Sequence, residues 1–179
     1  AEELILVDAD DRETGHLSKA ACHDGDGVLH RAFSLFLFNS RGELLLQQRA
    51  SSKRLWPEYW SNSCCSHPRL GESMETATLR RLQDELNVEA ELEFVYRFQY
   101  QVRFDEFGSE NELCHVYLGR VQDSMQANSE EIAALRFVSA EDLDAELAKQ
   151  PDRFTPWLKL EWQALRRDHA GVVSRYVRN

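Results

Sequence analysis

The segment from Trp56 to Glu72 holds an unusually dense group of reactive side chains, with two indoles, a phenol, two thiols and an imidazole. Within it, Cys65 stands two residues before His67. A thiol and an imidazole at this spacing allow two interpretations, a nucleophile with its base or a pair of metal ligands. Either function needs further residues from other parts of the chain.

Three imidazoles and two carboxylates form a second candidate group, made of His23, His30, His67, Glu110 and Glu112. In a strand, Glu110 and Glu112 would point to the same side. Structural Zn²⁺ sites prefer four Cys or His ligands, whereas added carboxylates suit Mn²⁺, Mg²⁺ or a Zn²⁺ ion of higher coordination. Taken alone, each histidine is more often an ordinary surface or core residue, and spacing does not decide between these interpretations.

A basic run of Arg49, Lys53 and Arg54 stands out in an acidic protein, because 21 basic and 31 acidic residues leave a net charge of −10. This balance argues against a nucleic-acid partner and against an anionic membrane surface. An anionic small substrate would have to find local basic residues such as these. By itself, however, the run is explained as well by a solvated surface.

The length of 179 residues suits a single domain, residues 1–179, that buries one core without disulfide or metal support. No apolar run approaches the ~18 residues of a membrane span, and the first residues lack the order of a signal peptide. The adjacent Cys64 and Cys65 do not suggest a secreted disulfide framework, because neighbouring cysteines pair only under strain. We therefore expect a cytoplasmic protein with reduced thiols.

The elements that must position these residues follow from the period of the apolar side chains. Strands are predicted at residues 4–7, 31–38, 43–49, 89–104, 110–121 and 130–138. The turns at 39–42 and 105–109 predict two antiparallel pairs, of which 31–38 with 43–49 reads as a β-hairpin. The run Asp-Gly-Asp-Gly at 24–27 predicts a loop between His23 and His30.

Three- and four-residue apolar spacing predicts an amphipathic helix of about four turns from Glu72, with Asn87 as its stop. Arg81 and Glu85 share a face of this helix, and a surface ion pair is the simplest explanation for them. A capping-box pattern at Ser139 opens another helix, and residues 154–169 predict a terminal one. Strands in the first two thirds and helices at the end indicate an α+β fold.

The residues around the first helix follow the register of a Nudix box, G-x5-E-x7-R-E-U-x-E-E-x-G-U, where U is a bulky apolar residue. The matching positions are Ser66, Glu72, Arg80, Arg81, Leu82, Asp84, Glu85, Asn87 and Val88. Joined with residues 62–68 and 110–112, this pattern resembles the type I isopentenyl-diphosphate isomerase family of the Nudix superfold, over residues 19–157. The resemblance implies a Nudix-like mixed sheet sandwiched by helices, with an extra N-terminal strand segment and C-terminal helices.

The resemblance also implies the chemical roles. The five His and Glu residues of the second group would ligate one divalent metal, Mn²⁺, Mg²⁺ or Zn²⁺. Cys65 and Glu112 would give and remove protons on opposite sides of the substrate carbons, with Tyr100 assisting the acidic side. The diphosphate of a small-molecule substrate would contact Lys19, Arg49, Lys53 and Arg81. Glu85 and the main-chain carbonyl of Cys65 would hold a Mg²⁺ ion bound with the substrate.

The implied reaction converts isopentenyl diphosphate to its allylic isomer by protonating an unactivated alkene and deprotonating the resulting tertiary carbocation. Because alkenes are very weak bases, the acid must act in a site without water, beside a cation. Trp157 would stabilise the carbocation through its ring, by roughly 1 to 2 kcal/mol, and Trp60 could also line the pocket. Without the resemblance, Cys65 and Trp157 would be read as core residues and Glu112 as a solvated carboxylate.

Two alternatives remain open. The first is a Nudix diphosphohydrolase acting on a nucleoside diphosphate derivative. Arg81 disfavours it, because a cation in place of the box's first metal-binding glutamate weakens water attack and favours anion binding. The second is a binding module with structural Zn²⁺ held by Cys64, Cys65, His67 and Cys114, which the lack of a C-x-x-C pair disfavours. The sequence determines neither the metal, nor the protonation of Cys65, nor the oligomeric state.

Overall fold

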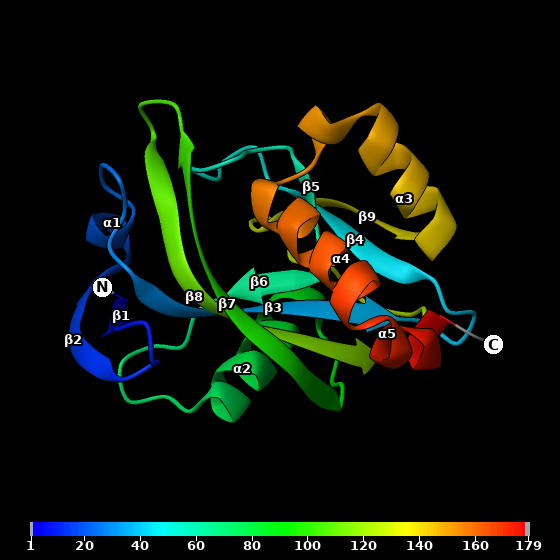
Figure 1. Ribbon diagram of the computed structural model, residues 1–179, viewed down its shortest axis with the longest axis horizontal. Coiled ribbons are helices and arrows are strands. Elements are labelled where there is room, and N and C mark those ends of the chain that lie inside the picture. Colours follow the sequence, from blue (N-terminus) through cyan, green and yellow to red (C-terminus); the bar gives the residue numbers. More distant parts are fainter. Residues whose placement is uncertain (1, 178–179) are drawn as a thin grey trace.

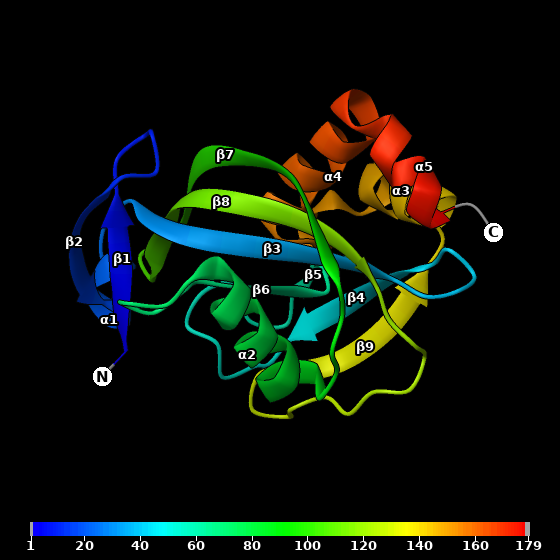
Figure 2. The same ribbon diagram turned by 90° about the horizontal axis from the view of Figure 1, so that it is seen from below.

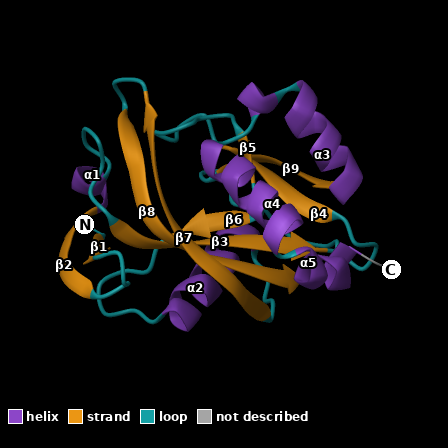
Figure 3. Cartoon of the chain, viewed as in Figure 1, coloured by secondary structure: helices purple, strands orange, loops and turns teal. Residues whose placement is uncertain are grey.

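The computed structural model describes residues 2–177 as one mixed sheet of nine strands with helices on both faces (Figures 1 and 3). The strands are β1 (Glu3–Val7), β2 (Glu13–Ser18), β3 (His30–Phe38), β4 (Leu44–Arg49), β5 (Trp60–Ser61), β6 (Cys64–Ser66), β7 (Leu92–Phe104), β8 (Gly108–Arg120) and β9 (Ile132–Val138). The helices are α1 (Lys19–Cys22), α2 (Met74–Leu86), α3 (Ala140–Lys149), α4 (Pro156–Asp168) and α5 (Ala170–Val177), with a 3-10 turn η1 (Pro151–Arg153).

β3 is the central strand of the sheet. On one edge it runs parallel to β8, from the pair His30↔Glu112 to the pair Phe38↔Arg120. On the other edge it lies antiparallel to β6, where Ser34 faces Cys65. A strand with neighbours on both edges and helices over both faces is buried throughout, which explains why β3 is almost continuously apolar.

The predicted hairpin of residues 31–38 with 43–49 is wrong over most of its length. β3 and β4 pair only at Phe38↔Leu44, beside the turn that joins them. Beyond that point β6 takes the edge of β3, and β9 and β5 pair with β4. These partners come from distant parts of the sequence, and local turn rules contain no information about them. The other predicted pair, β7 with β8, is confirmed as a long antiparallel ladder.

The other predicted strands and helices are present, with ends shifted by up to three residues. The loop at 24–27 is also confirmed, but α1 and β2 precede it, and the reactive segment contains β5 and β6. α5 follows the predicted terminal helix as a separate element. Most of the missed elements have two to six residues, which is too short for an apolar period to show.

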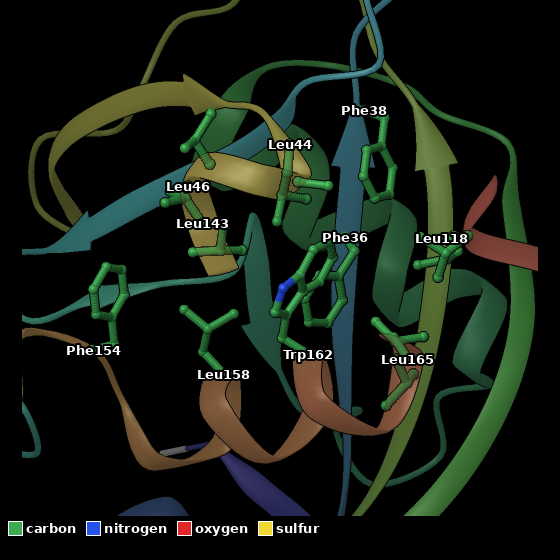
Figure 4. Packing of buried hydrophobic residues seen from close by; sticks show 14 residues of the cluster. Phe36, Phe38, Leu44, Leu46, Leu118, Leu143, Phe154, Leu158, Trp162 and Leu165 are labelled. Atoms are coloured by element: carbon green, nitrogen blue, oxygen red, sulfur yellow. The ribbon is translucent and has the colours of Figure 1, made fainter. Parts of the chain in front are cut away.

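The two faces of β3 pack against different helices (Figure 2). On one face, Phe33, Leu35 and Leu37 belong to a core cluster with Ala77, Leu82 and Leu86 of α2. On the other, Phe36 and Phe38 pack in a cluster with Leu158, Trp162 and Leu165 of α4 (Figure 4). The alternation follows from the two-residue period of a strand. Among residues 2–177, no helix combines the length and apolar character needed to cross a membrane.

Candidate active site

A cavity of about 500 Å³ gathers side chains from α1, β6, α2, β7, β8 and α4. All the side chains predicted for the site line this cavity except Trp60 and His30, and His30 is fully buried. The predicted residues in the wall are Lys19, His23, Arg49, Lys53, Cys65, His67, Arg81, Glu85, Tyr100, Glu110, Glu112 and Trp157. Residues that lie up to 138 positions apart in the sequence thus line one cavity.

The histidines and glutamates converge because β8 runs beside the start of β3. His30 faces Glu112 across this ladder, and its Nε2 lies 3.5 Å from Glu112 Oε2 and 3.9 Å from Glu110 Oε1. His23, at the end of α1, places Nε2 2.9 Å from Glu110 Oε1. Ligand atoms of His23, His30 and Glu110 all lie within 4.8 Å of one another, as a metal site requires.

Two of the imidazoles are oriented by main-chain carbonyls. Nδ1 of His23 donates to Lys19 O and Nδ1 of His30 donates to Val28 O, each at 2.8 Å. Since a carbonyl only accepts hydrogen bonds, Nδ1 carries the proton and Nε2 faces the carboxylates, the arrangement common for metal-binding histidines. Within residues 2–177, the buried His30 Nε2 has no hydrogen-bond partner. A divalent cation would satisfy this atom and the carboxylates together.

His67 lies beside the same group, with its ring centroid 5.8 Å from that of His30 and 6.4 Å from that of His23. Burial, reinforced by the neighbouring imidazoles and Lys19, holds the pKa of His67 well below its usual value. The ring is therefore neutral, which is the form that binds metals. His67 and Glu112 lie outside the tightest three-residue group but border it, and the donor set as a whole fits a divalent ion.

The two glutamates differ in protonation behaviour. Burial raises the pKa of Glu110, but the imidazoles of His23 and His30 outweigh it and leave the pKa below its usual value. The pKa of Glu112 is raised, first by burial and then by the charge of Glu110. Two carboxylates side by side favour unequal protonation. Glu112 is therefore the one of the pair that retains a proton more readily.

Cys65 and Glu112 approach the cavity from strands on the two edges of β3, β6 and β8. The hydroxyl of Tyr100 donates a hydrogen bond to Glu112 Oε1, and burial together with the charge of Glu112 raises the pKa of Tyr100 well above its usual value. Burial also raises the pKa of Cys65 to about 12. Both Tyr100 and Cys65 are therefore protonated at neutral pH.

Trp157 presents a buried aromatic face to the cavity, with 2% of its surface exposed. Its Nε1 donates to Ser61 Oγ at 3.0 Å, and the guanidinium of Arg49 lies 5.2 Å from its ring centroid. The ring is thus already adjacent to a cation. Trp60, by contrast, is absent from the wall and stacks with Arg136 at 4.6 Å. Its expected place in the pocket is therefore wrong, because β5 presents it to the α3 and α4 side.

The four basic side chains predicted to bind the diphosphate, Lys19, Arg49, Lys53 and Arg81, all line the cavity. Arg49 is held by its donors to the carbonyls of Leu55 and Trp56. Arg81 donates to Glu85 at 2.7 Å, and their side chains are 15% and 5% exposed. This pair is therefore buried, and its interpretation as a surface ion pair is wrong. Burial also lowers the pKa of Lys19.

Comparison with known proteins identifies the family. The NUDIX domain family matches residues 28–158. A Photorhabdus laumondii protein named isopentenyl-diphosphate Delta-isomerase 1 is 40% identical over 170 residues, covering 94% of this chain and 97% of its own length. A Serratia proteamaculans isopentenyl-diphosphate Delta-isomerase is 46% identical over 156 residues, 87% of each chain. The chain belongs to the isopentenyl-diphosphate Delta-isomerase family.

The fold of this isomerase-family member is also found in a crystal structure of a Deinococcus radiodurans protein. The two agree with a TM-score of 0.71 at 25% identity, covering 99% of this chain and all of the other. The mixed sheet between helices is thus a Nudix fold, as the resemblance predicted. The box helix is α2, which brings Arg81 and Glu85 to the cavity.

The arrangement of cysteines contradicts a structural Zn²⁺ site in this isomerase-family protein. Cys64 packs in the core cluster on the α2 face of the sheet. Cys114 packs with Tyr100 and Trp157 on the opposite face, where Cys65 contacts the same cluster. Adjacent residues of a strand point to opposite faces, so Cys64 and Cys65 cannot bind one ion together without breaking β6. The binding-module alternative is therefore wrong.

Three further charged residues at or near the site have no role implied by the family resemblance, although Arg54 belongs to the basic run noted in the sequence. Arg54 lines the cavity and donates to the carbonyls of Phe107 and Ala20 and to Asp24. Glu131 pairs with Lys53. Glu161 on α4 is fully buried behind the cavity, beside Cys114. Glu131 and Glu161 are single charged residues that belong to no motif. Only for Glu161 was there a weak signal, since it stands four residues after Trp157 on the same helix face.

Proposed function

We propose that this protein interconverts isopentenyl diphosphate and dimethylallyl diphosphate by moving one proton onto the substrate and one off it. The observation that carries this proposal is the cavity wall, in which the thiol of Cys65, the Glu112–Tyr100 pair and the ring of Trp157 meet a group of cations. The names of its relatives support the same reaction.

The proton-transfer groups would work from two sides of the substrate carbons. Protonation of the terminal alkene carbon produces a tertiary carbocation, and loss of a proton from the neighbouring methylene moves the double bond. Glu112, hydrogen-bonded to Tyr100, and Cys65 come from strands on opposite edges of β3 and supply the two groups. Because the reaction is reversible, the group that donates in one direction accepts in the other.

The carbocation would lie against the buried ring of Trp157. An aromatic face attracts a cation through its quadrupole, by about 2 kcal/mol when water is excluded. The Arg49 guanidinium lies 5.2 Å from the centroid of the same ring, which is one cation–π contact of this ring. Tyr100 and Trp157 are both buried, and exclusion of water from this end of the cavity when substrate is bound would protect the intermediate from attack by water.

A divalent metal, Mn²⁺, Mg²⁺ or Zn²⁺, would be held by His23, His30, His67, Glu110 and Glu112. When bound, the ion supplies positive charge that fixes Glu112 and makes its carboxyl group a stronger acid. The protein's own contribution is orientation, since the carbonyls of Lys19 and Val28 set the tautomers of two imidazoles. This ion belongs to the proton-transfer side of the cavity.

The diphosphate would occupy the basic side of the cavity, against Lys19, Arg49, Lys53 and Arg81. Glu85 and the main-chain carbonyl of Cys65 would take a Mg²⁺ ion that arrives with the substrate. Arginine binds phosphate oxygens through its planar guanidinium fork, and Mg²⁺ binds them through its compact charge. Arg81 in place of a metal-binding glutamate favours holding the diphosphate over hydrolysing it, which argues against the diphosphohydrolase alternative.

The decisive experiment incubates metal-loaded protein with isopentenyl diphosphate and Mg²⁺ and measures both the acid-labile allylic product and free phosphate. We expect allylic product without phosphate release, and a decrease in kcat of at least about 100-fold in Cys65→Ala and Glu112→Gln. Cys22→Ala is the matched control, because this buried thiol lies outside the cavity wall and its loss should leave kcat unchanged.

Two outcomes would overturn the proposal. Release of phosphate that persists in Cys65→Ala would identify a hydrolase, because hydrolysis needs no thiol in the cavity. Allylic product at an undiminished rate in both variants would mean that other residues transfer the protons. Circular dichroism of each variant establishes that any loss of activity does not come from unfolding.

A further inference from the structure

Glu131 stands immediately before β9 and reaches into the basic side of the site. Its Oε2 pairs with Lys53 Nζ, and its Oε1 lies 3.6 Å from Arg81 Nη2. The main chain holds it in place, because Ala50 N donates to Glu131 O at 3.1 Å. The side chain is 26% exposed, so the carboxylate sits at the margin of the cavity between two cations proposed to bind phosphate.

Glu131 shares Arg81 with Glu85. The same Arg81 nitrogen, Nη2, donates to Glu85 Oε2 at 2.7 Å. The carboxylates of Glu85, on α2, and of Glu131, just before β9, therefore meet at one guanidinium. Burial raises the pKa of Glu131, but Lys53 and Arg81 outweigh it and lower the pKa below its usual value. Both cations are therefore paired with carboxylates of the protein itself.

Binding of a diphosphate must change these pairs. If its oxygens take the donors of Lys53 and Arg81, Glu85 and Glu131 each lose a partner and face a like-charged ligand. A partly buried carboxylate left without a partner is strongly unfavourable. A divalent ion removes this conflict, because Mg²⁺ binds carboxylate and phosphate oxygens together. The cations would then serve the diphosphate and the carboxylates would serve the metal.

We propose that Glu131 acts with Glu85 as a carboxylate for the divalent ion that accompanies the diphosphate, so that the site accepts a metal-bound diphosphate and penalises a metal-free one. The inference rests on the proposed function only in its assumption of a metal-bound diphosphate substrate. It assigns Glu131 a binding role and leaves the proton transfers to Cys65 and Glu112.

This role makes a different prediction from a structural one. In Glu131→Gln, Lys53 and Arg81 lose a competing charge, so metal-free diphosphate should bind at least as tightly as it does to the unaltered protein. Mg²⁺ should strengthen that binding far less, because one of its charged ligands is gone. If Glu131 merely positions the two cations, the substitution should weaken binding equally with and without Mg²⁺.

The test is calorimetric titration with inorganic pyrophosphate, with and without Mg²⁺, of protein already loaded at the histidine–glutamate site and freed of excess metal. The measured quantity is the ratio of Kd without Mg²⁺ to Kd with it. We expect this ratio to fall about 10-fold or more in Glu131→Gln. Glu130→Gln is the matched control, since its side chain is exposed and the ratio should not change.

A second readout replaces Mg²⁺ with Mn²⁺ and follows the electron paramagnetic resonance signal of free Mn²⁺ in the presence of pyrophosphate. Glu131→Gln should bind less Mn²⁺ than Glu130→Gln does. An unchanged ratio in Glu131→Gln, or equal weakening under both conditions, would overturn the inference. Because no isomerisation is measured, these results stand apart from the outcome of the activity assay.

Discussion

His30 is the buried residue of the candidate metal site whose two ring nitrogens have different surroundings. Its side chain is fully buried, its Nδ1 is committed to Val28 O, and its Nε2 has no hydrogen-bond partner within residues 2–177. The nearest carboxylate oxygens, from Glu112 and Glu110, lie 3.5 and 3.9 Å away, which is longer than a good hydrogen bond. The simplest reason for the protein to maintain this atom is a metal that binds to it.

We therefore expect His30→Gln to weaken binding of a divalent metal about 100-fold or more, because it removes a ligand that the main chain has already oriented. Competition against a chromogenic chelator, without substrate, measures this affinity. His16→Gln is the control, since that imidazole lies on β2, is 55% exposed and pairs with Glu3. Equal metal affinity in the two variants would exclude His30 as a ligand.

At the scale of the element, α2 places Arg81 and Glu85 at the cavity, and its two ends determine where it lies. Ser73 caps the start through a hydrogen bond from Thr76 N to its Oγ at 3.1 Å. Asn87 ends the helix in the left-handed conformation, with φ of 54°. Asparagine tolerates this conformation better than most residues with a Cβ atom, and glycine tolerates it best.

Replacement of Asn87 by alanine should lower the free energy of unfolding by about 1 kcal/mol, because alanine is strained at positive φ. Asn87→Gly should change it by only a few tenths of a kcal/mol. Glycine relieves the strain of positive φ in the folded state, but it also raises the conformational entropy of the unfolded chain, and the two effects nearly cancel. Urea denaturation of both variants measures the difference. If alanine and glycine were equivalent, the left-handed turn would not determine the end of α2.

At the scale of the whole molecule, Glu161 joins α4 to the centre of the sheet. Its Oε2 accepts from Ser34 Oγ at 2.9 Å and from Cys114 Sγ at 3.5 Å, while Oε1 has no hydrogen-bond partner within residues 2–177. Burial raises the pKa of this carboxyl well above its usual value of 4.5. The folded protein therefore keeps a proton on Glu161 that the unfolded chain releases near pH 4.5.

This difference ties stability to pH. As pH rises above about 4.5, the unfolded chain loses the Glu161 proton while the folded state retains it, so the free energy of unfolding falls by about 1.4 kcal/mol per pH unit until the folded pKa is reached. Glu161→Gln removes this contribution. Relative to the unaltered protein, the variant should become progressively more stable between pH 4.5 and neutral pH.

Urea denaturation at several pH values, with the metal removed by one chelator throughout, measures this trend. The difference in unfolding free energy at the acidic end reports packing alone, because both side chains are then neutral. Glu141→Gln, an exposed change on α3, is the matched control. A stability difference between Glu161→Gln and the unaltered protein that is independent of pH would mean that Glu161 is ionised in the folded state.

Much of the fold could be predicted from local patterns. The alternation in β7 and β8, the three- and four-residue spacing in α2 and the capping pattern before α3 each depend on contacts between near neighbours in sequence. Strand partners depend on distant residues, which is why the hairpin of β3 with β4 was predicted where β3 in fact pairs with β6 and β8. The turn residues between β3 and β4 determine only the pairing beside the turn, at Phe38 and Leu44.

The sequence alone determined the types of chemical group in the site, and the resemblance to a family assigned them roles. Only the tertiary structure decided that His30 faces Glu112 and that Cys65 and Cys64 belong to opposite faces. It also decided that Glu131 pairs with Lys53 and that Glu161 is buried beside Cys114. The reason is physical: residue type sets what a side chain can do, whereas its neighbours and burial set which of these things it does, and both depend on contacts between distant segments.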